Sequence, residues 1–264
     1  MGGGPAGLEA ARVCALRGHE VILYEKQKEL GGRLLSAVLA PHKEEVKGIL
    51  EYQIRQVTAL PVKINMGVDI DETSLKEEKA DTVIVATGSL PLSLGMLQRG
   101  DESRRIEEKG VIYAEDVLRG KEMKGKTIAV IGGGMIGCEV SEFLIQRGKR
   151  IRLIEMLEDL ALDMSSRPRW LLLRRLHDSG QVEVLTKTRV RGIRNGMIIA
   201  EREGQEVELG KVDGIVLAIG YRPDDVLFNS LKGKVSELHA IGDCVKPQKA
   251  FEAIQDGFKL GLEI

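Results

Sequence analysis

Two short glycine-rich segments have the residue types and spacing of a phosphate-binding turn. Gly2-Gly3-Gly4-Pro5-Ala6-Gly7 opens the sequence, and Gly132-Gly133-Gly134-Met135-Ile136-Gly137 repeats the pattern 130 residues later. In such a turn the first glycine allows a sharp bend out of a strand, and the second lets the backbone approach a pyrophosphate. The third lets the next helix pack closely on the sheet. The helix N-terminus then faces the phosphates with its N–H groups and positive dipole end.

An acidic residue follows each segment, 18 residues after its last glycine: Glu25 in the first copy and Glu155 in the second. A carboxylate at this place accepts a hydrogen bond from a ribose hydroxyl. Glu9 and Glu139 also match at the offset of 130. The repeat predicts two dinucleotide sites, and two in one chain indicate electron transfer between dinucleotides. The alternative is that the glycine-rich units serve helix packing alone.

Each turn needs a buried strand directly before it. Residues 126–131 (Lys-Thr-Ile-Ala-Val-Ile) supply that strand for the second copy, whereas only Met1 precedes the first. In a doubly wound sheet this strand is central and buried on both faces, so its neighbours lack ladder partners without it. We therefore expect the chain to be an N-terminally truncated piece, the product of a misassigned gene start, or half of a split enzyme.

The remaining pattern predicts an α/β chain. Residues 81–88 and 213–220 are apolar strands that recur at an offset of 132 and end in Ala-x-Gly, where the glycine allows close backbone approach to a cofactor. We expect a turn plus helix over 2–18 and helices over 43–58, 167–180 and 248–264. We expect strands over 21–24 and 62–66, and a final strand and turn over 238–243. We also expect a polar connector over 91–125, an antiparallel meander over 181–212 and a hinge at 221–223.

Composition narrows the function classes. The 264 residues suffice for one large or two ordinary domains. A net charge of -1 argues against a general nucleic-acid or anionic-membrane partner, and an aromatic content of 3% argues against stacking on single strands. No apolar run reaches the length of a membrane span, and no signal peptide is visible.

Three widely spaced cysteines, Cys14, Cys138 and Cys244, include no CxxC or CxxxxC pair. The chain alone therefore offers neither a redox-active disulfide of that kind nor an iron–sulfur or zinc cluster. Cys14 and Cys138 fall on the expected fingerprint helices as small buried hydrophobes. Cys244 is either an inert thiol or a residue near a cofactor. The odd count suits a reducing cytoplasm.

These motifs in this order resemble the two-dinucleotide-binding-domain flavoproteins of glutathione-reductase-like fold. The resemblance is closer to the C-terminal half of the old-yellow-enzyme-like iron–sulfur flavoproteins, which include 2,4-dienoyl-CoA reductase, 2-enoate reductase and trimethylamine dehydrogenase. It covers nearly the whole chain and is carried by residues 2–11, 25–32, 111–118, 240–244 and 253–254. It implies two Rossmann-like domains: an FAD-binding domain of residues 1–90 plus 222–264, and an NAD(P)-binding domain of residues 91–221 inserted in it.

The resemblance also implies site residues. FAD would be bound by Gly2, Gly4, Pro5, Ala6, Gly7, Glu25, Lys26, Gly32, Arg33, Val68, Ala86, Thr87, Gly88, Gly242 and Asp243. The nicotinamide dinucleotide would be bound by Gly132, Gly134, Met135, Ile136, Gly137, Glu155 and Gly220. The alternative for Asp243 is a helix cap at a turn. Neither a catalytic acid or base nor a metal ligand is predicted.

Residues around Glu155 bear on the choice between NADH and NADPH. The acid accepts from a free 2′-hydroxyl and repels a 2′-phosphate, so it favours NADH. A phosphate-binding site usually has an arginine just after the strand, where Met156 and Leu157 stand here. Arg150 and Arg152 lie within the expected strand, which leaves NADPH open.

One departure from the family limits the function that can be inferred. In the family a flavin-bearing barrel with an iron–sulfur cluster precedes this region and reduces the substrate, and this chain has neither. The resemblance therefore implies an FAD-dependent NAD(P)H oxidoreductase module that passes electrons from NADH to FAD and on to an FMN/iron–sulfur barrel domain or another acceptor. Alternatives are a free-standing reductase of a small carrier or of oxygen, a non-redox ADP-binding module, and a non-functional fragment of a larger enzyme.

Overall fold

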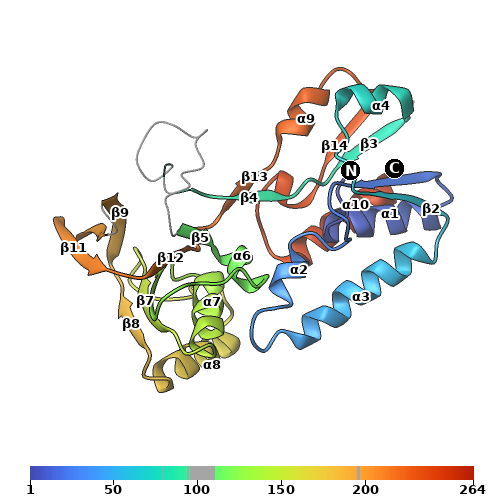
Figure 1. Cartoon of the computed structure of the whole chain (residues 1–264). Coiled ribbons are helices and arrows are strands. Elements are labelled where there is room, and N and C mark those ends of the chain that lie inside the picture. Colours follow the sequence, from blue (N-terminus) through green and yellow to red (C-terminus); the bar gives the residue numbers. More distant parts are fainter. Residues whose placement is uncertain (79, 94, 96–110, 195–196) are drawn as a thin grey trace. The chain divides into compact units, whose positions relative to one another are not determined.

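The chain folds into two compact units in a computed structural model that describes all residues except 79, 94, 96–110 and 195–196 (Figure 1). Unit 1 comprises Met1–Val38, Lys43–Leu90 and Tyr221–Ile264. Unit 2 comprises Leu39–His42 and Pro91–Gly220. Each unit is thus assembled from segments that are separate in the sequence.

The secondary structure alternates between strands and helices in both units. The first part of unit 1 contains α1 (Pro5–Leu16), β1 (Val21–Glu25), α2 (Leu34–Ala37), α3 (Glu44–Thr58), β2 (Val62–Met66), α4 (Glu72–Glu78), β3 (Thr82–Val85) and β4 (Ser89–Pro91). Its C-terminal part contains β13 (Tyr221–Pro223), α9 (Val226–Leu231), β14 (Glu237–Ala240), the 3₁₀ turn η1 (Gly242–Cys244) and α10 (Ala250–Glu263). Unit 2 contains β5 (Val111–Tyr113), α6 (Ala114–Leu118), β6 (Thr127–Ile131), α7 (Met135–Ile145), β7 (Arg150–Ile154), α8 (Ser166–Asp178), β8 (Val182–Leu185), β9 (Thr188–Arg194), β10 (Met197–Arg202), β11 (Gln205–Lys211) and β12 (Gly214–Leu217).

Unit 2 is built on a parallel five-stranded sheet of order β5-β12-β6-β7-β8. The central strand β6 is buried on both faces, which explains its continuous apolar run. Ile128 and Val130 pack in the cluster formed with α7 and α8, whereas Ala129 and Ile131 pack in the cluster formed with β9 and β10. The carboxyl end of this strand leads directly into the second glycine-rich turn.

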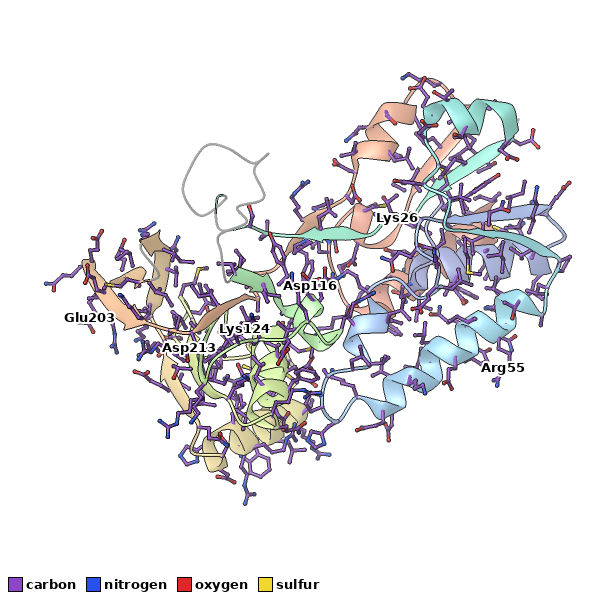
Figure 2. All side chains as sticks on the ribbon, viewed as in Figure 1. Lys26, Arg55, Asp116, Lys124, Glu203 and Asp213 are labelled. Carbon is purple, nitrogen blue, oxygen red and sulfur yellow. The ribbon has the colours of Figure 1, made fainter. Side chains whose placement is uncertain are left out.

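Asp213, labelled in Figure 2, ties the beginning of β12 to the beginning of β6. Its Oδ2 accepts hydrogen bonds from the backbone N–H groups of Thr127 (2.8 Å) and Lys126 (2.7 Å). These bonds favour the ionised carboxylate and lower the pKa of Asp213. The aspartate that opens the recurring strand pattern therefore fixes the register of the central strands.

Unit 1 contains two separate pairs of parallel strands, β1 with β2 and β3 with β14. Met1 and Gly2 lie between the two pairs. The Met1 amino group donates to the Ile84 carbonyl (2.7 Å), and the Met1 carbonyl accepts from the Ala86 N–H (2.8 Å). On the other side, the Gly2 N–H donates to the Tyr24 carbonyl (2.8 Å). Met1 and Gly2 together thus link the β3 side to β1.

Unit 2 shows what fills the equivalent space. There, the Ala218 N–H donates to the Ile131 carbonyl and the Gly132 N–H donates to the Ile154 carbonyl, at 2.8 and 2.9 Å. Ile131 is the last residue of β6, so Met1 occupies the position of the last residue of a central strand. Among the described residues of unit 1 no further strand joins β1 to β3, and a pocket lined by residues of α1, β1 and β3 lies there.

Helix α1 is buried along most of its length because small residues let other helices approach it. A Cβ atom at Gly257 of α10 would lie 2.2 Å from the Ala6 carbonyl oxygen, and one at Gly261 would lie 2.8 Å from the Val13 Cβ. Glu9 is buried on this helix, and its carboxylate accepts two hydrogen bonds from Arg12 (2.6 and 3.0 Å). Close glycine contacts therefore hold α10 against the fingerprint helix.

Three predictions about the elements need correction. The expected connector over 91–125 contains β5 and α6, which add an edge strand and a helix to unit 2, while its polar part at 98–109 lies outside the described residues. The expected meander over 181–212 is confirmed for β9, β10 and β11, but β8 joins the parallel sheet instead. The segment 221–223, expected to be a hinge, is the strand β13 and pairs with β4.

When the chain is produced with Met1 as its first residue, the buried amino group of Met1 predicts a pH-dependent stability of unit 1. Burial lowers the pKa of this group from 8.0 to about 6, against weaker opposing effects of Cys244 and Glu25. The unfolded chain then binds more protons than the folded chain between pH 6 and 8. The free energy of unfolding should therefore rise with pH across this interval, by on the order of 2 to 3 kcal/mol. Urea unfolding at pH 6, 7 and 8 measures the rise.

A matched control places Thr-Ile-Ala-Val-Ile, the sequence of β6, directly before Met1. The amino group at Met1 then becomes an amide, and the added residues can pair with β1 and β3. This variant should lose the rise between pH 6 and 8 and unfold at a higher urea concentration. The same pH dependence in both proteins would contradict the assignment to Met1.

Candidate functional site: two dinucleotide-binding turns

The first glycine-rich turn is shaped by backbone contacts that leave no room for side chains. Gly2 has a φ of +104° and a Cβ there would lie 2.2 Å from the Ala86 carbonyl oxygen. A Cβ at Gly7 would lie 1.9 Å from the Gly2 carbonyl oxygen. Such distances exclude any side chain unless the backbone moves. The first and third glycines of the motif therefore allow the turn and the helix to touch.

The second turn has the same geometry. Gly132 has a φ of +100° and a Cβ there would lie 2.3 Å from the Ala218 carbonyl oxygen. A Cβ at Gly137 would lie 1.8 Å from the Gly132 carbonyl oxygen. The sequence repeat is thus also a repeat of backbone structure. In both copies the first glycine lies against the carbonyl of the residue that follows the recurring strand, Ala86 after β3 and Ala218 after β12.

The second glycine of each motif, Gly4 or Gly134, is the N-cap of the following helix. Outside its own turn, the described atom nearest to a Cβ placed on Gly4 would be the Gly32 Cα, at 3.9 Å. Pro5 occupies the first helical position, where the missing N–H costs nothing. The first-turn N–H groups that follow have no acceptor within the helix, so Ala6 and Gly7 in α1, and Ile136 and Gly137 in α7, present donors suited to a phosphate.

The two acidic residues are buried: Glu25 is the last residue of β1, and Glu155 directly follows β7. In the first copy, Glu25 Oε2 accepts from the Gly3 N–H (2.6 Å) and Oε1 from the Gln27 N–H (2.8 Å). In the second copy, Glu155 makes the same two bonds with Gly133 (2.6 Å) and Leu157 (2.8 Å). Each carboxylate oxygen retains acceptor capacity, so a ribose hydroxyl can bind in addition. Sequence reasoning did not predict that these acids also shape the turns.

Gly32 and Arg33 approach the first turn from the loop before α2. Gly32 has a φ of +53°, and a Cβ there would lie 3.0 Å from the Gly4 Cα. The Arg33 Nη1 donates to Ser89 Oγ (2.9 Å) and to Asp243 Oδ2 (3.2 Å), and its guanidinium lies 3.2 Å from the centroid of the Tyr221 ring. The predicted residues Arg33 and Asp243 are thus brought together by Ser89 and Tyr221, which sequence reasoning missed.

Asp243 binds both a side-chain cluster and a backbone N–H. Its Oδ2 accepts from Arg33 and from Ser89 Oγ (3.1 Å), while Oδ1 accepts from the Gln248 N–H (3.0 Å) just before α10. Gly242 precedes it with a φ of +67°, and a Cβ there would lie 2.8 Å from the Ala6 Cβ. The turn-capping interpretation of Asp243 therefore has a structural basis, and its role toward a cofactor stays a prediction.

The other predicted residues of unit 1 lie at strand ends. Lys26, labelled in Figure 2, follows β1. Its Nζ lies 4.0 Å from Asp224 Oδ2. Val68 follows β2 and is exposed. The segment Ala86-Thr87-Gly88 follows β3, and Thr87 Oγ1 donates to the Asp224 carbonyl (2.6 Å). In unit 2, Gly220 follows β12 with a φ of +104°.

The second turn also has a side-chain neighbour that sequence reasoning missed. Asp163 Oδ1 accepts from the Met135 N–H (2.9 Å), the first residue of α7. Asp163 stands 130 residues after Arg33, so the repeat offset is the signal that could have found it.

The three cysteines are buried and free. Burial raises the pKa of Cys14 and Cys244, and raises that of Cys138 to about 12. These thiols therefore stay protonated and unreactive near neutral pH. Over the described part of the chain, no group of three metal-ligating side chains comes together, and no helix is long and apolar enough to cross a membrane.

Comparisons with known proteins agree with this geometry. A family model described as pyridine nucleotide-disulphide oxidoreductase matches residues 1–257. The chain is similar to the NADH oxidase of Thermoanaerobacter brockii (33% identical, 100% of this chain and 40% of that protein). It is also similar to the cinnamate reductase of Clostridium sporogenes (30% identical, 100% and 38%).

Solved structures extend the comparison to the fold. A 2-naphthoyl-CoA reductase matches with a TM-score of 0.88 at 28% identity, over 100% of this chain and 39% of that one. The thioredoxin reductase of Lactococcus lactis matches with a TM-score of 0.73 at 18% identity, over 99% and 95%, which shows a shared α/β fold. The chain spans about two-fifths of the NADH oxidase, the cinnamate reductase and the 2-naphthoyl-CoA reductase, and corresponds to their C-terminal portion.

The glycine contacts predict opposite effects of the same substitution at two helical positions of unit 1. Gly7→Ala should destabilise unit 1 by on the order of 2 to 4 kcal/mol, because its Cβ would collide with the Gly2 carbonyl oxygen. Gly48→Ala in α3 should stabilise it by about 0.5 to 1 kcal/mol, because Gly48 is exposed and nothing lies within 4 Å of its Cβ position. Urea unfolding of both variants checks this, and equal effects would refute the packing role of Gly7.

Proposed function

Because the chain belongs to the pyridine nucleotide-disulphide oxidoreductase family, we propose that it is an electron-input module that passes reducing equivalents from NADH to FAD and on to another domain or protein. The observation that carries this proposal is the presence of two dinucleotide-binding turns with equivalent backbone geometry in one chain. When bound, the FAD would accept hydride from the nicotinamide, and the protein supplies binding and orientation. No side chain is needed as an acid or base for that transfer.

We assign FAD to the domain of residues 1–90 plus 222–264, and the nicotinamide dinucleotide to residues 91–221. The residues of unit 1 fit the adenosine and pyrophosphate part of FAD. Gly4 leaves space at the N-terminus of α1, Gly32 lines that space with backbone only, and Glu25 lies at the end of the next strand. The guanidinium of Arg33 is bound to Asp243 and Ser89, so the N–H groups at the start of α1, and not this charge, carry the fit to a ligand with two phosphates.

In unit 2, Glu155 supports NADH as the electron donor. Arg152 is already bound to Glu183 Oε2 (2.7 Å) and to the Leu209 carbonyl. Arg150 begins β7, four residues before the strand's end and so about 13 Å from it. Neither arginine is thus placed to bind a 2′-phosphate beside Glu155, and that favours NADH over NADPH.

The electron acceptor is proposed to lie outside this chain. Two of the relatives, a cinnamate reductase and a 2-naphthoyl-CoA reductase, are longer proteins. This chain matches about two-fifths of each. The three described cysteines are unpaired and inert, so a disulfide acceptor within the chain is not supported. An FMN/iron–sulfur barrel domain, or another protein, is the acceptor that the resemblance favours.

The proposal is tested by the visible spectrum of the purified chain, before and after reconstitution with FAD. We expect bound flavin whose visible absorbance bleaches when NADH is added without oxygen. Bound flavin that NADH does not bleach would refute the transfer from NADH. A protein that binds ADP but no flavin would instead be a non-redox nucleotide-binding module.

Two isosteric substitutions test the assignment of cofactors to units and serve as controls for each other. Glu25→Gln removes one acceptor oxygen from the first turn, so it should lower FAD content without changing NADH affinity. Glu155→Gln should keep its FAD content but lose the repulsion of a 2′-phosphate, so the preference for NADH over NADPH should fall about tenfold. Flavin content and the dissociation constants of NADH and NADPH measure these effects. Loss of FAD in the Glu155 variant alone would reverse the assignment.

A further inference from the structure

The two dinucleotide-binding turns share a backbone but differ in the charge placed beside them. The N–H of Gly31 donates to the Gly3 carbonyl and that of Ala161 to the Gly133 carbonyl, both at 2.7 Å. The repeat at an offset of 130 thus extends through the loop after each acidic residue. Two residues further along each loop, Arg33 and Asp163 occupy corresponding positions of the repeat.

Asp163 lies directly on the N-terminus of α7. Its Oδ1 accepts from the Met135 N–H at 2.9 Å, and both carboxylate oxygens lie 3.6 Å from the Cβ position of Gly134. At the corresponding place in unit 1, a Cβ added to Gly4 would face the Gly32 Cα and no described side chain within 4 Å. Arg33 is turned instead to Ser89 and Asp243.

This difference matters because a helix N-terminus attracts whichever anion is nearest. In unit 2 the protein supplies an anion of its own, which takes one backbone N–H of the first turn. A pyrophosphate brought to the same helix end must displace this carboxylate or accept repulsion from it. In unit 1 no described carboxylate accepts from a first-turn N–H of α1, and the nearby Asp243 is paired with Arg33 (3.2 Å).

We propose that Asp163 is an internal competitor for the pyrophosphate of the nicotinamide dinucleotide, and that it weakens binding in unit 2 relative to unit 1. This inference rests on the proposed function. It explains how two turns of the same geometry can serve a dinucleotide that must exchange in every turnover and one that stays bound. Asp163 is therefore a residue that sets affinity, acting through the α7 N-terminus.

The test measures binding of ADP-ribose and NADH by calorimetry to the FAD-reconstituted protein and to three variants. Asp163→Asn keeps the acceptor for the Met135 N–H and removes only the charge. Asp163→Ser keeps a helix-capping oxygen and serves if the first variant is unstable. Glu206→Gln, on the exposed face of β11 in the same unit, makes the same change in net charge away from the turn.

We expect Asp163→Asn and Asp163→Ser to bind both ligands about tenfold more tightly, with the difference shrinking at high salt. Glu206→Gln should bind as the unsubstituted protein does. Unchanged or weaker binding by both Asp163 variants would overturn the proposal and leave Asp163 a helix cap. An equal gain in Glu206→Gln would also overturn it, because the effect would then come from net charge. If no protein binds either ligand, the proposed function itself fails, and this inference with it.

Discussion

A buried carboxylate fixes the shape of each dinucleotide-binding turn, and the rest of each unit is organised around it. Glu25 is the last residue of β1 and Glu155 directly follows β7, and each accepts at 2.6 Å from the N–H of the middle residue of its Gly-Gly-Gly segment, Gly3 or Gly133. Burying a charge is costly unless hydrogen bonds compensate, and here two backbone N–H groups do so. The bonds lock the turn to the neighbouring strand, so the next helix begins at a fixed place with its N-terminus toward the ligand space.

This constraint explains why glycine is needed on both sides of the turn. With the turn held by the carboxylate, the helix can touch the sheet only if Gly7 and Gly137 carry no Cβ. The same reasoning applies to α10, whose Gly257 packs on the Ala6 carbonyl. Unit 1 therefore depends on close contacts between backbones. A small change at these positions has a large effect on stability, while exposed glycines such as Gly48 are free to change.

The two turns differ in the charged side chains that lie beside them. Arg33 stacks on Tyr221 and binds Asp243, whereas Asp163 binds the start of α7. A shared backbone can thus carry different local charges, because side chains beside a turn can change without changing the fold. The family shows that such chains combine FAD and NAD(P) binding, and the charges proposed to separate the two sites belong to this chain.

The sequence by itself determined the repeat, the positions of the turns and the acidic residues, because glycine spacing and the period of apolar strands are local properties of the chain. It did not show the carboxylate bonds to Gly3 and Gly133, or that Ser89 and Tyr221 join Arg33 and Asp243. These contacts link residues up to 210 positions apart. The tertiary structure alone decided that β5 and α6 complete unit 2 and that Met1 lies between β1 and β3, because the pairing of strands depends on which edges the folded chain brings together.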